Sequence, residues 1–360
     1  MQTWRAPGWR GLTRAALALL AGVLLVEPLT VMAAAGTLRS PWDATPPQQA
    51  TTPASCPRAP DLPAGIAATS YYADAARSIA DPRRKREYDI AVNPLREAAS
   101  SVAGMADRYR DTGDRSAAQC AMAWLAKFAA DGVLTGAMSS NQARYVQGWI
   151  MGAFAATALK IRTGTGSSRE TMRVGDWLAR LADTQVAYYE ARAGKIDGRN
   201  NHRYWAGFAI MAVGILSERQ GLFDWGVASF RIGIAQITRD GTLPVEMQRG
   251  ARALHYHLFA AAPLVAIAEL AAANGMDLYS EENHALPRLV HRALGGVEDS
   301  AFFTEKTGQE QEPVGVDAAA VGWAAPYAQR FHDRRVAAFV ARAQTTAFVY
   351  LGGKPPSVEP

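Results

Sequence analysis

Helical periodicity is the feature of this chain that most constrains its fold. From about residue 66 onward, apolar side chains recur at the three- and four-residue spacing of a buried helix face, and no stretch alternates as a strand does. Short breaks such as GTGSS, AGKIDG, RDGTLP and ANGMD interrupt the pattern. It predicts helices at about 170–192, 202–218, 221–237, 248–273 and 282–295.

Two further segments indicate how such helices would pack. DRSAAQCAMAWLAKFAADG predicts a helix with Cys120, Trp124, Leu125 and Phe128 on one stripe, ending at Gly132. ARYVQGWIMGAFAATALKIR is apolar on most sides, so it must be buried between neighbours. Successive antiparallel helices predict an all-α fold of stacked hairpins. Periodicity alone leaves open whether they form a solenoid or a closed α/α toroid.

The first segment is typical of an export signal. A basic stretch, MQTWRAPGWRGLTR, precedes the apolar run AALALLAGVLLV, and VMAAAG offers an Ala-x-Ala cleavage site at Ala33 and Ala35. The run is too short to span a bilayer, which disfavours an uncleaved membrane anchor, and no other run approaches the length required. Residues 1–35 are therefore predicted to be a signal peptide, and the periplasm is the expected compartment.

The charge of the chain points to acidic ligands without identifying one. Cleavage after Ala35 would remove three arginines and one glutamate, a net +2, so the net charge would fall from +5 to about +3. The only basic run, DPRRKRE at 81–87, is interpreted as a solvated face, and no nucleic acid is expected. We find no zinc-type Cys/His spacing, phosphate loop or Gly-x-Ser-x-Gly elbow, so we expect neither metal nor other cofactor.

The residues after the signal divide into an arm and a domain. Residues 36–63 are rich in Pro, Ala, Thr and Ser, which predicts an extended arm before a single domain at 64–360. Cys56 lies in the arm and Cys120 in a predicted helix. An oxidising compartment favours a disulfide between them, but spacing does not show proximity, so two separate thiols remain an alternative.

A first group of polar side chains occurs in KIDGRNNHRYW, at 195–205. It contains Asn200, Asn201, His202 and Arg203, just before the pair Tyr204 and Trp205. Asparagine commonly caps a helix, so a purely local role is one reading. The other is chemical: neutral hydrogen-bonding groups gathered at one helix terminus.

A second group occurs in VEMQRGARALHYHLF, at 245–259. Arg249 and Tyr256 are seven apart and Arg252 and Tyr256 four apart, so all three are expected on one helix face. A neighbouring arginine favours a phenolate, so we expect a lowered pKa for Tyr256 and a possible base. The alternative is an ordinary core tyrosine covered by Arg252.

Across most of the mature chain, from ATSYYADAAR to EKTGQEQEP, the sequence resembles the alginate lyases of polysaccharide lyase family 5. NNHRYWAGFAIM resembles the family's Asn-Asn-His-x-Tyr-Trp segment. LFDWGVASFRIGIAQITRDGTLPVEMQRGARALHYH resembles its long downstream block, and LFDW, ANGMDL and EKTG add further identities. Cys56 and Cys120 also stand where the family carries its two cysteines.

The resemblance implies an α/α toroid that cleaves polyuronates by β-elimination without a metal. It implies that Asn201, His202 and Arg249 stabilise the uronate carboxylate as charge develops on it. Tyr256 is then the base that takes the C5 proton and the acid that protonates the leaving oxygen. For the epimer with the proton on the opposite face, His202 is the better base. The implied partner is an anionic uronan: polymannuronate, or glucuronan or hyaluronan.

The chain also departs from the family's pattern. The lid lysine after TS is absent, and an aromatic pair stands there instead; a tyrosine replaces a cleft-wall tryptophan; and a histidine precedes the catalytic tyrosine. We therefore expect a shifted or relaxed substrate choice. The candidates for substrate contact are Tyr71, Tyr72, Tyr145, Trp205, Arg252 and His255, with a packing role in the core as the alternative for Tyr145 and Trp205.

Two other functions stay open from the residues alone. An α/α-toroid glycoside hydrolase needs two carboxylates across a cleft, for which Glu246 and Asp197 are the nearby candidates. A non-catalytic uronan-binding or export-associated protein would use the same cleft only to hold polymer. In every case we expect a monomer.

Overall fold

The computed structural model describes residues 37–46, 48–49 and 52–357. Residues Thr37–Pro360 cluster as one compact unit. Its larger helices are α1 (Pro82–Thr112), α2 (Arg115–Ala130), α3 (Asn141–Thr165), α4 (Arg169–Glu190), α5 (Asn201–Leu216), α6 (Gln220–Ile234), α8 (Ala253–Ala272) and α9 (Glu281–Glu298). Shorter ones are α7 (Pro244–Met247), α10 (Ala301–Thr307), α11 (Ala318–Val321), α12 (Ala325–Arg330) and α13 (Arg334–Val340). The predicted signal peptide lies outside the described residues.

The helices begin and end where side-chain chemistry dictates. Asp81 accepts a hydrogen bond from the Arg84 amide and Pro82 follows it, so the first turn of α1 is capped. Serines cap α3 and α4 in the same way, at Ser140 and Ser168. Gly132, after α2, has a φ of 65°, a left-handed conformation that glycine adopts without strain. The predicted helices are thus present, with ends shifted by a few residues.

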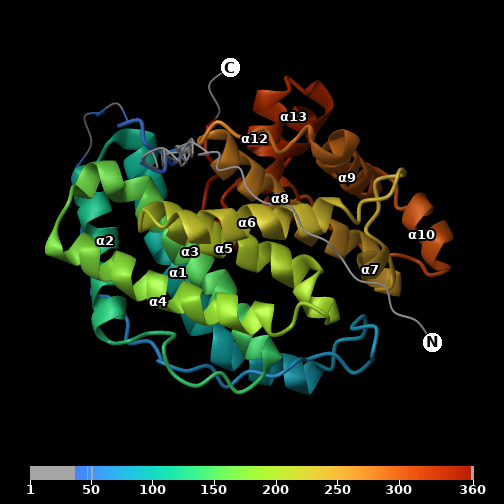
Figure 1. The fold of residues 1–360 in the computed structure, drawn as a ribbon, viewed down its shortest axis with the longest axis horizontal. Helices are drawn as coiled ribbons and strands as arrows, with labels where there is room; N and C mark the ends of the chain where they lie inside the picture. The colour runs from blue at the N-terminus through green and yellow to red at the C-terminus, as the bar shows by residue number, and fades with distance from the viewer. Residues whose placement is uncertain (1–36, 47, 50–51, 358–360) are drawn as a thin grey trace, which may run out of the picture. The chain divides into compact units, whose positions relative to one another are not determined.

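Antiparallel helix hairpins build the fold, which is an incomplete α/α toroid. Helix α5 packs against α3, α4, α6 and α8, and α4, α5 and α6 run side by side in Figure 1. As predicted, α3 is buried on all sides from Tyr145 to Ile161. The approach of α5 to α6 needs glycine, because a Cβ at Gly207 would lie 2.6 Å from the Ser229 Cβ.

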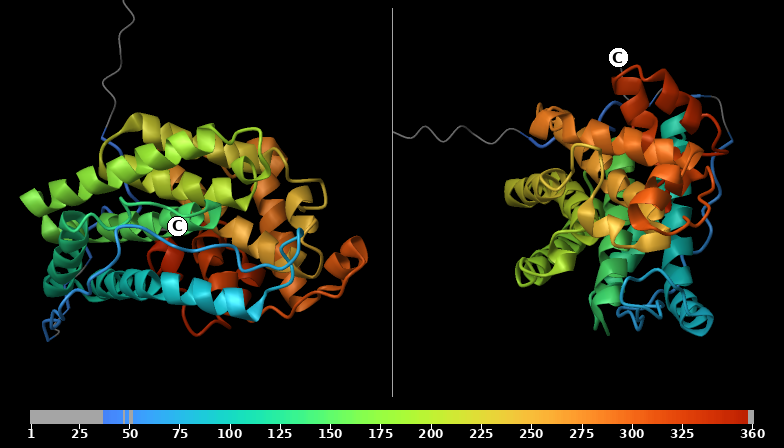
Figure 2. Two further views of the ribbon diagram at one scale, coloured as in Figure 1. Left: turned by 90° about the horizontal axis from the view of Figure 1, so that it is seen from below. Right: turned by 90° about the vertical axis from the view of Figure 1, so that its right-hand side faces the viewer.

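The C-terminal segment packs inside this ring of helices. The short 3₁₀ turn Val349–Leu351 contacts α1 and α3, and the left view of Figure 2 shows α1 (cyan) on the opposite side of the unit from α4 and α6. A Cβ at Gly352, whose φ is 75°, would lie 2.7 Å from the Ala156 Cβ. Residues far apart in sequence therefore meet in the centre of the unit.

Two expectations from the sequence need correction: where the first helix begins, and that no run after the signal peptide approaches the length of a membrane span. Helix does not start near residue 66: residues 64–81 form a loop with isolated bridges Ile66–Met138 and Tyr72–Ala80, and α1 begins at Pro82. Moreover, Gly250–Ala272 is long and apolar enough to cross a membrane by length and composition. However, 83% of its most apolar window is buried inside the unit, as expected for a core helix.

The arm packs along the helices. Cys56 is joined to Cys120 of α2 by a disulfide, and the carbonyl of Pro57 accepts a hydrogen bond of 2.9 Å from Trp124 Nε1. The Ala54 amide donates to Asp114, which also caps α2.

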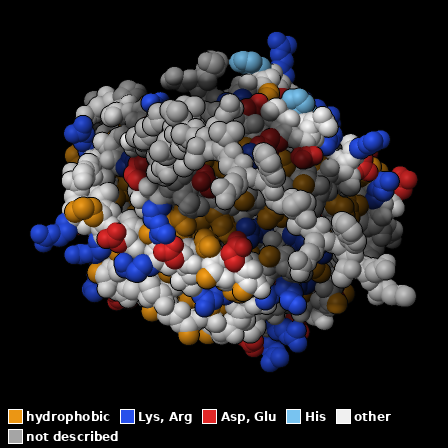
Figure 3. Space-filling model, viewed as in Figure 1, with side chains coloured by type: hydrophobic (Ala, Val, Ile, Leu, Met, Phe, Trp, Pro, Cys, Tyr) orange, Lys and Arg blue, Asp and Glu red, His pale blue; other side chains and the backbone are white. Residues whose placement is uncertain are grey.

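On the face drawn in Figure 3, lysine and arginine side chains are interspersed with acidic ones.

Candidate active site

The start of α5 brings the asparagine and histidine candidates to one place. Asn200 is the cap: its Oδ1 accepts from the His202 amide at 3.0 Å. Asn201 is the first helical residue and is fully buried. Its backbone N and side-chain Nδ2 both donate to Glu246 Oε1, at 3.1 Å and 2.8 Å. Capping therefore accounts for Asn200 and leaves Asn201 free for another role.

Arg249 reaches Tyr256 by a different route from the one predicted. Gly250 has a φ of 56°, and a Cβ there would lie 2.4 Å from Gln309 Oε1, so the chain breaks at this glycine. Helix α8 begins only at Ala253, and the expectation that Arg249 and Tyr256 share one helix is wrong. The two side chains nevertheless meet, with the Arg249 guanidinium carbon 4.3 Å from the centre of the Tyr256 ring.

His202, Arg249 and Tyr256 line one cavity of about 350 Å³. Tyr71, Tyr72, Arg252 and His255 line it as well. Within the part of the chain that the structure describes, no Asp or Glu lines this cavity, whereas five basic residues do: Arg77, Lys85, Arg96, Arg249 and Arg252. Such a lining favours an anionic ligand.

The Tyr256 hydroxyl is held in a tyrosine–arginine network. It shares a 2.7 Å hydrogen bond with the Tyr72 hydroxyl, which in turn accepts from Arg252. Burial raises the pKa of Tyr256, although Arg249, the Tyr72 hydrogen bond and Arg252 all oppose this rise. The expectation that arginine lowers this pKa overall is therefore wrong, because burial outweighs the nearby positive charges.

His202 is a neutral group at this site. Burial, with the positive charges of Arg249 and Arg77, lowers its pKa well below the ordinary value. Its Nδ1 is buried without a hydrogen-bond partner, which leaves Nε2 as the nitrogen a ligand can reach. The ring stacks on that of Tyr145 at 3.7 Å between centroids. The Tyr145 hydroxyl donates to Asp197 at 2.6 Å, which fixes the stack.

A second cavity, of about 620 Å³, adjoins the first. Both are lined by Arg77 and Arg249, and the second also contains Arg192 and Lys195. Arg77 lies in a loop closed by the Ala73 amide donating to the Ile79 carbonyl, and the Ala76 carbonyl accepts from Arg249 at 3.5 Å. The wall of the second cavity also contains Asp197, which accepts a hydrogen bond from Arg192, so basic side chains outnumber acidic ones in both cavities.

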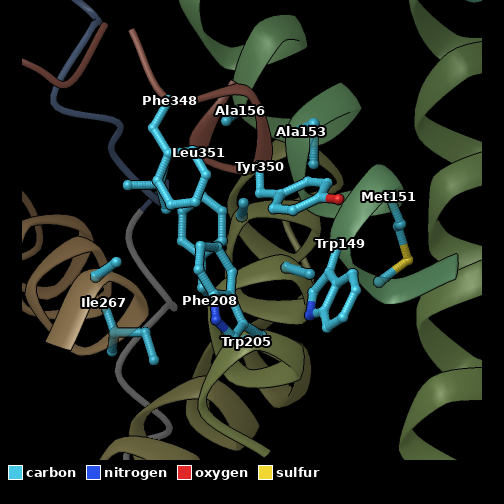
Figure 4. Packing of buried hydrophobic residues seen from close by; sticks show 14 of the residues in the cluster. Trp149, Met151, Ala153, Ala156, Trp205, Phe208, Ile267, Phe348, Tyr350 and Leu351 are labelled. Atoms are coloured by element: carbon cyan, nitrogen blue, oxygen red, sulfur yellow. The ribbon is translucent and has the colours of Figure 1, made fainter. Parts of the chain in front are cut away.

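Not all predicted substrate contacts lie at these walls. Trp205 is 1% exposed, donates from Nε1 to the Phe259 carbonyl at 3.0 Å and packs with Phe208, Phe348 and Tyr350 (Figure 4). It belongs to the core, so its assignment to substrate binding is wrong. Tyr145 lines the second cavity, but one face of its ring is covered by His202.

The carboxylates proposed for a hydrolase are engaged elsewhere. Asp197 accepts from Tyr145 and from Arg192 Nε, both at 2.6 Å, and Glu246 is 1% exposed and bonded to Asn201. Neither is poised to protonate a glycosidic oxygen. Among the described residues, no group of three or more His, Cys, Asp or Glu is arranged to hold a metal ion.

Sequence reasoning missed several residues of the cavity wall. Lys85 comes from the basic run that was interpreted as solvated, and Arg96 comes from the next turns of α1; both pair with Asp89 outside the cavity. Their spacing of eleven residues, three turns of helix, was the available signal that they share a face. No local sequence pattern identified Arg77 as a cavity residue; it lies in the loop before α1.

The fold and the cavity define an α/α-toroid protein that presents a histidine, a tyrosine and several arginines to an acidic ligand. The chain belongs to the alginate lyase family, whose sequence model, described as Alginate lyase, matches residues 65–303. It is therefore a polysaccharide lyase. A polysaccharide lyase of Stenotrophomonas maltophilia is 39% identical over 283 residues, covering 78% of this chain and 83% of that one. An alginate lyase of Azotobacter vinelandii is 32% identical over 284 residues, covering 76% and 75%.

Solved structures show the same fold. Alginate lyase A1-III from Sphingomonas species A1 superposes with a TM-score of 0.69 at 24% identity, covering 88% of this chain and 86% of that chain. A variant of alginate lyase A1-III complexed with a tetrasaccharide gives a TM-score of 0.73 at 24% identity, covering 88% and 89%. At this identity the likeness establishes the α/α toroid and nothing finer.

Proposed function

We propose that this lyase cleaves 4-O-linked polyuronates, with the polymannuronate of alginate foremost and glucuronan or hyaluronan as further substrates, by metal-independent β-elimination. The observation that carries the proposal is that His202, Arg249 and Tyr256 line one cavity to which the described residues contribute five Lys and Arg side chains and no Asp or Glu. The relatives named alginate lyase support alginate as the substrate.

Elimination first requires that the uronate carboxylate be neutralised. The proton at C5 is barely acidic while the carboxylate keeps its full charge, so donors must stabilise the dianion that develops on it. Arg249 supplies a charged donor and neutral His202 a donor at Nε2. Asn201 is fully buried and is not among the described residues that line the cavity; it precedes His202 and is linked to Arg249 through Glu246, and its amide is the third candidate donor. These groups act on a charge that is largest in the transition state.

Tyr256 is the candidate for both proton transfers. As a phenolate it takes the C5 proton, the C4–C5 double bond forms, and the bond from C4 to the glycosidic oxygen breaks. The proton then passes from Tyr256 to the leaving oxygen, so the tyrosine returns to its starting charge. Tyr72, hydrogen-bonded at 2.7 Å, and Arg249, over the ring, stabilise the phenolate. Positioned proton transfer of this kind is worth about 10²–10⁴ in rate.

The test is the ultraviolet absorbance of the conjugated C4–C5 double bond. Purified protein is incubated with polymannuronate, polyguluronate, glucuronan and hyaluronan across mildly acidic to alkaline pH. Absorbance that grows with time on at least one uronan supports the proposal. No absorbance and no products from any of the four uronans would contradict the proposal and favour a binding protein. New reducing ends without absorbance would contradict it and favour a hydrolase.

We further propose that the enzyme acts in the periplasm as a monomer. The basic and apolar segments within residues 1–35 support export, and the disulfide of Cys56 with Cys120 suits an oxidising compartment. Cell fractionation and the mass of the purified protein in solution test the two statements.

A further inference from the structure

A buried glutamate contacts two residues of the candidate active site. Glu246 is 1% exposed, and its Oε1 accepts both the backbone N–H and the side-chain N–H of Asn201. Its Oε2 is 3.4 Å from Arg249 Nε and has no hydrogen-bond partner. This carboxylate therefore contacts two of the residues that we assign to the uronate carboxylate.

The position of Glu246 is fixed by the packing of its helix. Pro244 opens the single turn of α7, and the preceding Leu243 amide donates to His257 Nε2 at 2.9 Å. Because Nε2 accepts, Nδ1 carries the hydrogen and donates to the Ala253 carbonyl at 2.7 Å. These hydrogen bonds link the start of α7 to α8 and hold the Glu246 backbone in place.

The chemistry of the pair determines which way the asparagine faces. A carboxylate only accepts hydrogen bonds, whereas a side-chain amide carries two N–H donors and one carbonyl acceptor. Asn201 therefore turns its NH₂ group towards Glu246, which engages one N–H; within the described part of the chain its Oδ1 is buried without a hydrogen-bond partner. Without an acceptor-only neighbour, the amide could rotate and present its oxygen, which would repel a uronate carboxylate.

We propose that Glu246 is a positioning residue of the lyase, which fixes the side-chain amide of Asn201 as a donor to the substrate carboxylate. The inference rests on the proposed β-elimination and adds a role that the catalytic groups themselves do not reveal. Glu246 acts through Asn201 and does not touch the substrate.

The decisive substitution is Glu246→Gln, which keeps the size of the side chain. Its amide can donate as well as accept, so it no longer dictates the orientation of Asn201. We expect kcat on polymannuronate to fall about 10- to 100-fold, less than the loss of a donor outright, with KM changed by less than about threefold. Glu246→Asp keeps the charge but withdraws the acceptor, and a similar loss is expected.

Glu269 supplies a matched control. It is 2% exposed, lies on α8, is not among the residues that line this cavity, and forms an ion pair with Arg330 at 2.6 Å. Glu269→Gln removes an equally buried carboxylate charge, so it reports what such a loss does to folding. We expect it to lower the melting temperature while kcat remains that of the parent.

A double-mutant comparison of Glu246 and Asn201 distinguishes a positioning role of Glu246 from a purely structural one. In an Asn201→Ala background, Glu246→Gln should lower kcat by about threefold or less, because the group it orients is gone. Equal losses in both backgrounds, or unimpaired activity of Glu246→Gln, would overturn the inference and leave the proposed function standing. A parent protein inactive on every uronan would overturn the proposed function, and this inference with it. If Glu246→Gln does not fold, the same double-mutant comparison with Asn201→Ala is made with Glu246→Asp.

Discussion

Mild acid is expected to destabilise this protein through His257. The imidazole is fully buried between α7 and α8, accepts from the Leu243 amide at Nε2 and donates from Nδ1 to the Ala253 carbonyl. A second proton on Nε2 would face the Leu243 N–H, so a donor would oppose a donor. Burial accordingly lowers the pKa of His257 to about 4.

The sign and size of the effect follow from linkage. A histidine in the unfolded chain binds its proton near pH 6.5, whereas His257 in the folded chain does so near pH 4. The stabilisation is therefore complete above pH 6.5 and is lost as pH falls from there towards 4. Between pH 7 and pH 5, the free energy of unfolding should decrease by about 2 kcal/mol through this group alone.

Urea unfolding at pH 7 and pH 5 measures this difference. The parent should lose about 2 kcal/mol more between the two pH values than His257→Gln, which cannot titrate at this position. Comparing each variant with itself removes the baseline effect of the substitution. His332→Gln, at an exposed histidine, should behave as the parent does. If His257→Gln and the parent lose equal stability, the buried imidazole does not hold α7 as described.

Two further outcomes follow from the packing and the charge of the site. Trp205→Ala should lower the free energy of unfolding by about 3–5 kcal/mol in urea, because it empties a core site among aromatic rings, whereas a substrate-contact residue would leave stability unchanged. Raising the salt concentration from about 0.05 M to about 0.5 M should raise KM for polymannuronate severalfold and change kcat by less than about twofold, since five basic residues line the cavity; a salt-independent KM would contradict an electrostatic role for them.

The sequence predicted those features of the fold that depend on local chemistry. Apolar spacing located the buried α3, and a glycine ended the helix before residue 132, because each depends only on neighbours in the chain. The first helix was predicted too early, since residues 64–81 form a loop with the bridges Ile66–Met138 and Tyr72–Ala80, and α1 begins at Pro82.

The site could be predicted only in part, because its geometry depends on distant contacts. His202, Arg249 and Tyr256 were identified from sequence and meet in one cavity. The break before α8 was not predicted, because Gly250, whose φ is 56°, lies in a stretch with the residue spacing of a continuous helix. Helical spacing shows which face of a helix a residue lies on but not what that face packs against, so the sequence could not decide between the core and the cleft for Trp205.

Tyr256→Phe, compared with the parent on polymannuronate, tests the central claim most directly. The substitution removes only the hydroxyl that exchanges the proton. Absorbance from the C4–C5 double bond should form at least about 10²-fold more slowly, while polymer binding and the melting temperature remain those of the parent. A Tyr256→Phe enzyme that forms unsaturated product at close to the parental rate would show that this tyrosine does not transfer the proton.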